Sequence, residues 1–262
     1  MRQVTLVALY GQKPPDLSEL LAECQKQIAS ELGGNFQPYD ISQIHATIIG
    51  LERTIGSAGL NLNLGKYRNM QGGMNFESLL SLIREGGLFP FQIQIGGFKN
   101  RAYPFVSRGQ RPYERAFSIQ GDKTVLMGWP IQGQPFANVR TDIVTMIHES
   151  RIYPPVLDNI RRASQNFNIL HAYHRLLTDV DNDFYFRIGL IENPLLNPLQ
   201  QQKVENELRQ FLSTIKPIVI QVTSQNVYIA SYEDETLPLI STKVWSVSDL
   251  KVTADFIGSL YE

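Results

Sequence analysis

Two side chains that could carry out phosphate chemistry lie two residues apart in the sequence IHATIIGLE, residues 44–52. Alternate side chains of a strand point to opposite faces, so His45 and Thr47 share one face while the apolar residues around them share the other. A neutral imidazole can accept or donate a proton near pH 7, and a hydroxyl can hold an anionic oxygen. The pair therefore indicates a phosphate site, although a strand histidine hydrogen-bonded to a neighbour would show the same spacing.

A second group of candidate residues lies in the loop KNRAYPFVSRGQRPYER, residues 99–115. Its basic residues are interleaved with aromatic ones, and guanidinium groups beside rings are what a single-stranded nucleic acid or a nucleotide needs. The residues that we expect to bind substrate are Arg101, Tyr103, Arg108 and Arg111. The alternative is a solvated loop whose rings hold it against the body, and its position relative to His45 separates the two.

The composition is that of a globular protein, because 43% of the 262 residues are hydrophobic and 19% are charged. The net charge of −1 gives no overall attraction to nucleic acid or to an anionic membrane, so a polyanion would need a local patch. The single cysteine, Cys24, excludes an internal disulfide and favours a reducing compartment, so we expect a cytoplasmic protein. The apolar run at residues 4–10 is too short to span a bilayer, and we expect no targeting segment, no transmembrane segment and no membrane partner.

Several nucleotide-binding and hydrolase signatures are absent from the sequence. It contains no GxxxxGK[ST] phosphate loop, no GxGxxG after a strand and no GxSxG elbow. Nucleoside triphosphate hydrolysis, dinucleotide chemistry and serine hydrolysis are therefore disfavoured.

Hydrophobic periodicity predicts strands that alternate with helices. The predicted strands are 3–10, 44–52, 89–98, 168–177, 183–192 and 241–247, with strand pairs at 115–130 and 217–232. The predicted helices are 14–32, 75–84, much of 136–165, and 198–215. Residues 56–75, rich in glycine and asparagine, are predicted to form a long flexible connection. No low-complexity linker separates the halves, so we expect residues 1–262 to form one domain of two lobes.

This order of elements resembles that of the two-histidine phosphoesterase superfamily, which includes RNA 2′-5′ ligase-like proteins and cyclic phosphodiesterases. Members carry a His-x-Thr/Ser motif in each of two related lobes, and the two motifs face each other across a groove. His45 and Thr47 match the first motif residue by residue. The resemblance covers most of the chain and implies an α+β fold of two pseudo-symmetric lobes, each with a small antiparallel sheet and flanking helices, around a central groove.

The second motif departs from the pattern of the superfamily. The corresponding strand is FYFRIGLIE, where Tyr185 stands in place of the histidine and Arg187 in place of the threonine or serine. Alternation still directs both side chains toward the groove. A tyrosine with an ordinary pKa of about 10 can donate a proton but is not a base at neutral pH, and an arginine can grip a phosphate with its planar fork. The catalytic set implied by the resemblance is His45, Thr47, Tyr185 and Arg187.

The remaining histidines are rival candidates for the missing imidazole. His171 and His174 are three residues apart, so a strand would direct only one of them to the groove, whereas a helix would place both on one face as a potential metal pair. No third ligand is evident in the sequence, and we expect neither a metal nor a cofactor. His148, followed by Glu149 in a predicted helix, is expected to form a surface pair.

The sequence thus leads to two alternative functions, and a structural protein with an empty groove is a third possibility. The first is a metal-independent phosphoesterase that acts on a 2′,3′-cyclic phosphate or a related phosphodiester of RNA or a nucleotide, with His45 as general acid or base. The second is a catalytically silent protein that binds nucleotides or RNA ends. In both, the partner is a nucleotide or RNA terminus that carries a phosphodiester.

Overall fold

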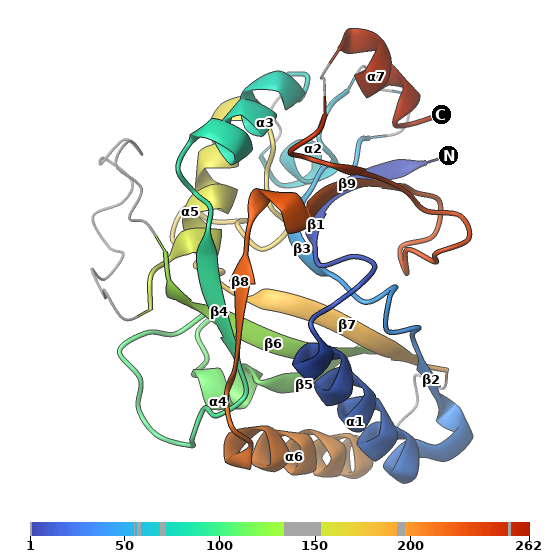
Figure 1. Ribbon diagram of the computed structural model, residues 1–262, viewed down its shortest axis with the longest axis vertical. Coiled ribbons are helices and arrows are strands. Elements are labelled where there is room, and N and C mark those ends of the chain that lie inside the picture. Colours follow the sequence, from blue (N-terminus) through green and yellow to red (C-terminus); the bar gives the residue numbers. More distant parts are fainter. Residues whose placement is uncertain are drawn as a thin grey trace.

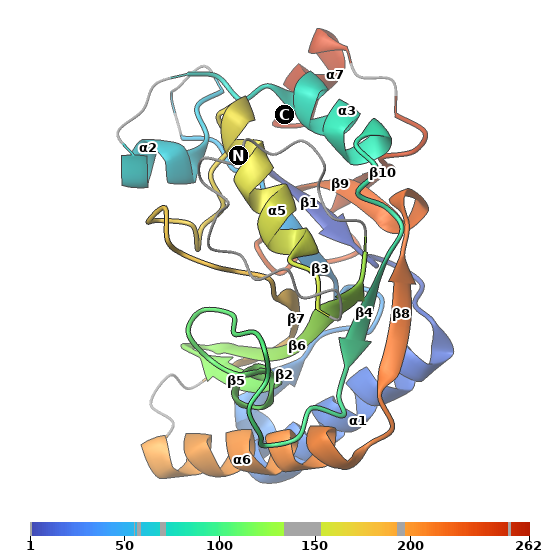
Figure 2. The ribbon, with the colours of Figure 1, turned by 90° about the vertical axis from the view of Figure 1, so that its left-hand side faces the viewer.

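The computed structural model describes residues 2–54, 56, 59–68, 72–133, 153–192, 197–250 and 253–262. His148, Glu149 and most of the helix predicted over 136–165 lie outside these residues. Within them, the protein has an α+β fold in which an antiparallel sheet is flanked by helices (Figure 1, Figure 2).

The strands form one sheet. They are β1 (Gln3–Ala8), β2 (Phe36–Pro38), β3 (Ala46–Gly50), β4 (Phe91–Ile95), β5 (Phe117–Gln120), β6 (Lys123–Gln132), β7 (Phe184–Ile191), β8 (Ile218–Val222), β9 (Val227–Tyr232) and β10 (Lys243–Ser246). Their order is β10-β9-β1-β3-β7-β6-β4-β8, with β2 paired to β7 and β5 paired to β6. The two small sheets expected from the resemblance are therefore joined into one.

The helices flank the sheet, and two pairs of them lie at its two ends. They are α1 (Pro15–Leu32), α2 (Leu62–Arg68), α3 (Phe76–Glu85), α4 (Pro112–Arg115), α5 (Val156–Ala163), α6 (Pro198–Thr214) and α7 (Ala254–Ser259). Both views show α1 and α6 side by side at one end and α3 with α7 at the other (Figure 1, Figure 2). No helix in the described ranges is long and apolar enough to cross a membrane.

The sequence around α1 explains why this helix forms. Pro15 occupies its first turn, where the fixed φ of proline suits a helix, and Gly33 follows its last residue with a φ of 55°. Its side chains at helical spacing belong to the main hydrophobic core, including Leu17, Leu21 and Cys24. Burial raises the pKa of the Cys24 thiol to about 12, so this cysteine is a core residue and not a nucleophile.

Three predictions of secondary structure are wrong. Residues 168–177 form turns because their two histidines are held by buried carboxylates and not by a strand ladder. Strands β8 and β9 exist, but β8 pairs with β4 while β9 pairs with β1 and β10, so they do not form a hairpin. The predicted connection 56–75 contains α2, because Asn61 caps its first turn by accepting a hydrogen bond from the Leu64 N–H at 3.0 Å.

The short link between β8 and β9 shows that the sheet is curled. In the strand order β8 lies six steps from β9, which would be roughly 29 Å in a flat sheet at about 4.8 Å per step. Residues 223–226 connect the two strands, and a connection of that length spans at most about 18 Å. The sheet therefore bends around the core until its β8 edge approaches β9, as the ribbon shows (Figure 1).

Strands β3 and β7 form a narrow seam in the middle of this sheet. Their antiparallel register contains the single pair Ala46 and Phe186, and both residues are fully buried in the core. By contrast, β7 and β6 pair over six positions from Lys123 to Gly128. The two halves of the sheet thus meet along a contact about one residue pair long, and they diverge on either side of it.

Candidate functional site

The four residues of the two sequence motifs flank the single register pair of the β3–β7 seam. In an antiparallel pair, the neighbours of a matched pair lie opposite each other on the other face. Thr47 is therefore level with Tyr185, and His45 is level with Arg187. All four side chains line one cavity of about 120 Å³.

The imidazole of His45 has a defined tautomer. Its Nδ1 lies 2.9 Å from the carbonyl oxygen of Gln43, and because a carbonyl can only accept, Nδ1 carries the proton and Nε2 keeps its lone pair. Burial lowers the pKa of His45 to about 4, and the charges of Arg187 and Lys13 add to the effect. His45 is therefore neutral at pH 7 and can accept a proton on Nε2.

On the β7 side of the seam, Tyr185 is a neutral phenol and Arg187 is a cation at neutral pH. Burial raises the pKa of Tyr185 to about 12, so the phenol remains a proton donor at neutral pH. Arg187 contacts the loop between β9 and β10, donating from Nη1 to the carbonyl oxygen of Glu235 at 3.3 Å and pairing with its carboxylate at 3.6 Å. Lys123 pairs with the same carboxylate at 3.3 Å, so Glu235 occupies the position where an anionic ligand would contact both cations.

Glu52 belongs to the site although sequence alternation did not reveal it. In the β1–β3 register, Val7 pairs with Thr47 and Leu6 pairs with Ile49, so Ile48 is an extra residue that reverses the alternation. Glu52 consequently returns to the face of Thr47 and lines the cavity of about 120 Å³.

Two local contacts hold the Glu52 carboxyl group in place. It lies over Gly50, where an added Cβ would stand 2.2 Å from Oε2, and it accepts a hydrogen bond from the Tyr232 hydroxyl at 2.8 Å. Burial raises the pKa of this carboxyl group above its usual value. An acid with a raised pKa and a histidine with a lowered pKa that line the same cavity are a combination suited to proton transfer.

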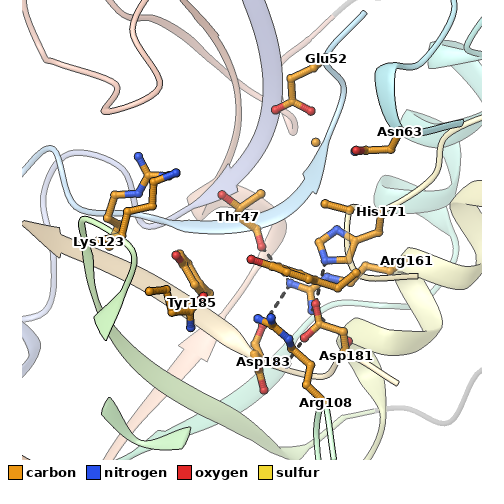
Figure 3. Close-up of a pocket in the computed structure, with 15 residues that line it drawn as sticks. Thr47, Glu52, Asn63, Arg108, Lys123, Arg161, His171, Asp181, Asp183 and Tyr185 are labelled. Atoms are coloured by element: carbon orange, nitrogen blue, oxygen red, sulfur yellow. Dashed lines mark hydrogen bonds and ion pairs between the residues drawn. The ribbon is translucent and has the colours of Figure 1, made fainter. Parts of the chain in front are cut away.

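A larger cavity of about 310 Å³ continues from the first and shares with it Thr47, Glu52, Tyr185 and Arg187. His171 lines this larger cavity and is held there by Asp181, whose Oδ2 lies 2.8 Å from the imidazole Nε2. Burial lowers the pKa of His171 to about 4, aided by the charge of Arg161. Figure 3 shows Thr47, Glu52 and His171 around one hollow, with Arg161, Asp181 and Asp183 along another side of it. A second imidazole is thus present at the site, contributed by a turn instead of by β7.

Arg161 of α5 fixes the backbone beneath this cavity. Its buried guanidinium donates to the carbonyl oxygens of Ile48 and Thr47 on β3, each at 3.0 Å. It also donates to those of Asp181 at 2.9 Å and Asp183 at 3.1 Å, just before β7. These four bonds hold β3 against the approach to β7 at the point where the two strands diverge.

The other sequence candidates lie in different surroundings. His174 is fully buried with its Nε2 2.8 Å from Asp158, and it lines neither cavity. Arg101 stacks on Tyr103 at 5.3 Å, and Arg111 binds Glu114 of α4. Arg101, Tyr103 and Arg111 also line neither cavity, whereas Arg108 of the same loop lines the larger one.

No group of three or more His, Cys, Asp or Glu side chains is placed to hold a metal ion in the part of the chain that the structure describes.

Comparison with known proteins finds similarity among solved structures alone. No family model matches the chain, and no curated protein matches its sequence. Among solved structures, the chain is similar to the crystal structure of TT0787 of Thermus thermophilus, with a TM-score of 0.41, 11% sequence identity and 94% of each chain covered.

Proposed function

We propose that the protein binds the phosphodiester of a nucleotide or RNA end at the β3–β7 seam and hydrolyses it, with a 2′,3′-cyclic phosphate as the leading substrate. The observation that supports this most is the juxtaposition of His45 and Thr47 with Tyr185 and Arg187 in one cavity. The four side chains together offer a proton acceptor, a hydroxyl, a proton donor and a fixed positive charge.

The proposed reaction needs no group beyond these side chains and water. Nε2 of His45 accepts a proton from a water molecule as its oxygen attacks phosphorus, and one ester bond to the ribose breaks. The departing ribose oxygen takes a proton from a donor on the other side, a role that we assign to Tyr185 of β7, which lines the same cavity. Thr47 and Arg187 hold the non-bridging oxygens, and Arg187 is freed for this when the ligand displaces Glu235.

A second candidate function is binding without turnover. It is favoured by Tyr185, whose pKa of about 12 makes the phenol a weaker acid than an imidazolium. In that case the same cavity, with Arg187 as the principal anion contact, recognises the phosphodiester and leaves it intact.

Turnover and binding of 2′,3′-cyclic nucleotides and of oligonucleotides that end in a cyclic phosphate separate these functions. We expect His45→Ala to lower turnover roughly 10²-fold to 10⁴-fold and Arg187→Ala to weaken binding about tenfold or more. Arg84→Ala is the matched control, because Arg84 lies on α3 and lines neither cavity.

Saturable binding without turnover in the parent, weakened by Arg187→Ala, would support the second function. Turnover that persists at the parent rate in His45→Ala would contradict the first, and absence of both binding and turnover would contradict both.

A further inference from the structure

Arg108 stands at the tip of a tight turn with an unusual backbone. Ser107 and Gln110 exchange two backbone hydrogen bonds of 3.0 Å each, and the two residues between them, Arg108 and Gly109, have φ values of 50° and 74°. Positive φ at both central positions is typical of a type I′ turn, where asparagine or glycine is favoured. An arginine at the first of these positions is strained, and such strain is retained where a side chain serves a purpose.

The turn is anchored so that this arginine has a fixed position. The Arg108 N–H donates to the Val180 carbonyl oxygen at 3.0 Å, and the Asn182 N–H donates to the Ser107 hydroxyl at 3.0 Å. The guanidinium carbon lies 3.6 Å from the centre of the Tyr173 ring. Both the backbone and the side chain of Arg108 are thus held before any ligand arrives.

Among the described residues, Arg108 has no ion-pair partner for its charge. Its Nη1 is buried and has no hydrogen-bond partner among the described residues, and no carboxylate of those residues lies within 4.0 Å of the guanidinium. The aspartates that line the same cavity are already paired, Asp181 with Arg161 and His171, and Asp183 with Arg115. A buried guanidinium donor without a partner is costly unless a ligand supplies the acceptor.

Arg108 faces the same cavity as the two cations that pair with Glu235, Arg187 and Lys123, but from a different side. Arg187, Lys123 and Arg108 all line the cavity of about 310 Å³, and Arg108 also lines an adjoining cavity of about 520 Å³. Figure 3 shows Lys123 and Arg108 reaching the cavity from different sides of Tyr185. The larger cavity thus has two positive regions, one formed by Arg187 and Lys123 and one at Arg108.

We propose that Arg108 binds a second phosphate of the substrate, the one on the 5′ oxygen of the nucleoside whose 2′,3′-cyclic phosphate lies at the seam. This inference rests on the proposed function and narrows its substrate class to RNA ends and 5′-phosphorylated nucleotides. A cyclic mononucleotide without a 5′-phosphate fills only the first region.

Three ligands test this: a nucleoside 2′,3′-cyclic phosphate, its 5′-phosphorylated form, and a dinucleotide ending in the same cyclic phosphate. The parent is expected to bind the two ligands with a second phosphate about tenfold or more tightly than the first. Arg108→Asn should remove that preference while keeping the turn intact, because asparagine tolerates positive φ. Comparison of the dinucleotide with the 5′-phosphorylated nucleotide isolates any contribution of the upstream nucleoside.

Lys216→Asn is the matched control, since it removes one positive charge from an exposed residue that lines none of the three cavities. For the ligands with two phosphates, the slope of log binding constant against log salt concentration should also decrease by about one in Arg108→Asn, and not in Lys216→Asn. If Arg108→Asn keeps the preference for ligands with a second phosphate, or if Lys216→Asn loses that preference equally, the inference about Arg108 is wrong. The proposed function would still stand in that case if turnover depends on His45. A parent that binds none of the ligands overturns both.

Discussion

At the scale of single residues, the site is defined by side chains whose protonation states are set by burial. His45 is the clearest case, because the Gln43 carbonyl fixes its tautomer and the buried environment keeps it neutral. From their spacing, His45 and Thr47 could be placed on one face of a strand, and both line the same cavity. Glu52 could not, because an extra residue in β3 reverses the alternation, and His171 could not, because a turn and not a strand presents it.

The depressed pKa of His45 has a consequence for the pH dependence of turnover. If His45 is the base, kcat/KM should stay constant from pH 8 to about pH 5 and fall toward pH 4, instead of falling near the ordinary imidazole pKa of about 6.5. A pH profile of kcat/KM with a cyclic nucleotide measures this. Arg187→Gln should move the fall to higher pH, because the charge of Arg187 helps to lower the pKa of His45. A fall near pH 6.5 in both proteins would show that another group is titrating.

At the scale of elements, the secondary structure of a segment could be predicted from the sequence more readily than its pairing partners in the sheet. Helix α1 and strand β7 follow from hydrophobic spacing and from the proline and glycine at helix ends. The partners of β8 and β9 did not follow, because alternation marks a strand without naming its neighbour. The position of Arg161 was also invisible to the sequence, since its four carbonyl partners come from two segments far apart in the chain.

Arg161 should therefore be among the most destabilising positions to change. Arg161→Met leaves four buried carbonyl oxygens and the Asp181 carboxylate without this partner, so the free energy of unfolding should fall by about 3–5 kcal/mol. Urea denaturation of the parent and the variant measures the difference. Lys203→Met, which removes an exposed ion pair with Glu31, should leave the free energy of unfolding nearly unchanged. Equal, small losses in the two variants would show that Arg161 does not hold the strands together.

At the scale of the whole molecule, folding keeps two histidines neutral that would titrate in the unfolded chain. The unfolded state binds protons at His45 and His171 below about pH 6.5, whereas the folded state does so only below about pH 4. Stability from these groups is therefore complete above pH 6.5 and falls as the pH drops toward 4. Between about pH 6.5 and pH 4, each histidine should lower the free energy of unfolding by about 1.4 kcal/mol for each unit that the pH falls.

Urea unfolding at pH 7, 6 and 5 tests this prediction when the parent is compared with the double variant His45→Asn/His171→Asn. The variant should lose less stability between pH 6 and pH 5 than the parent, by up to about 2.8 kcal/mol. Parallel pH dependences would mean that these imidazoles are not kept neutral by folding. The comparison cancels the carboxyl groups that contact neither histidine, because these titrate in both proteins.

The one-pair seam between β3 and β7 also limits how the gene can change. A single codon inserted between Phe184 and Phe186 would rotate every later side chain of β7 by half a turn, which would put phenylalanine into the aqueous hollow and the guanidinium into the apolar interior. Two stretches some 140 residues apart must therefore keep their alternation matched, so a change of length at this place would need a compensating bulge, of the kind that Ile48 already forms in β3.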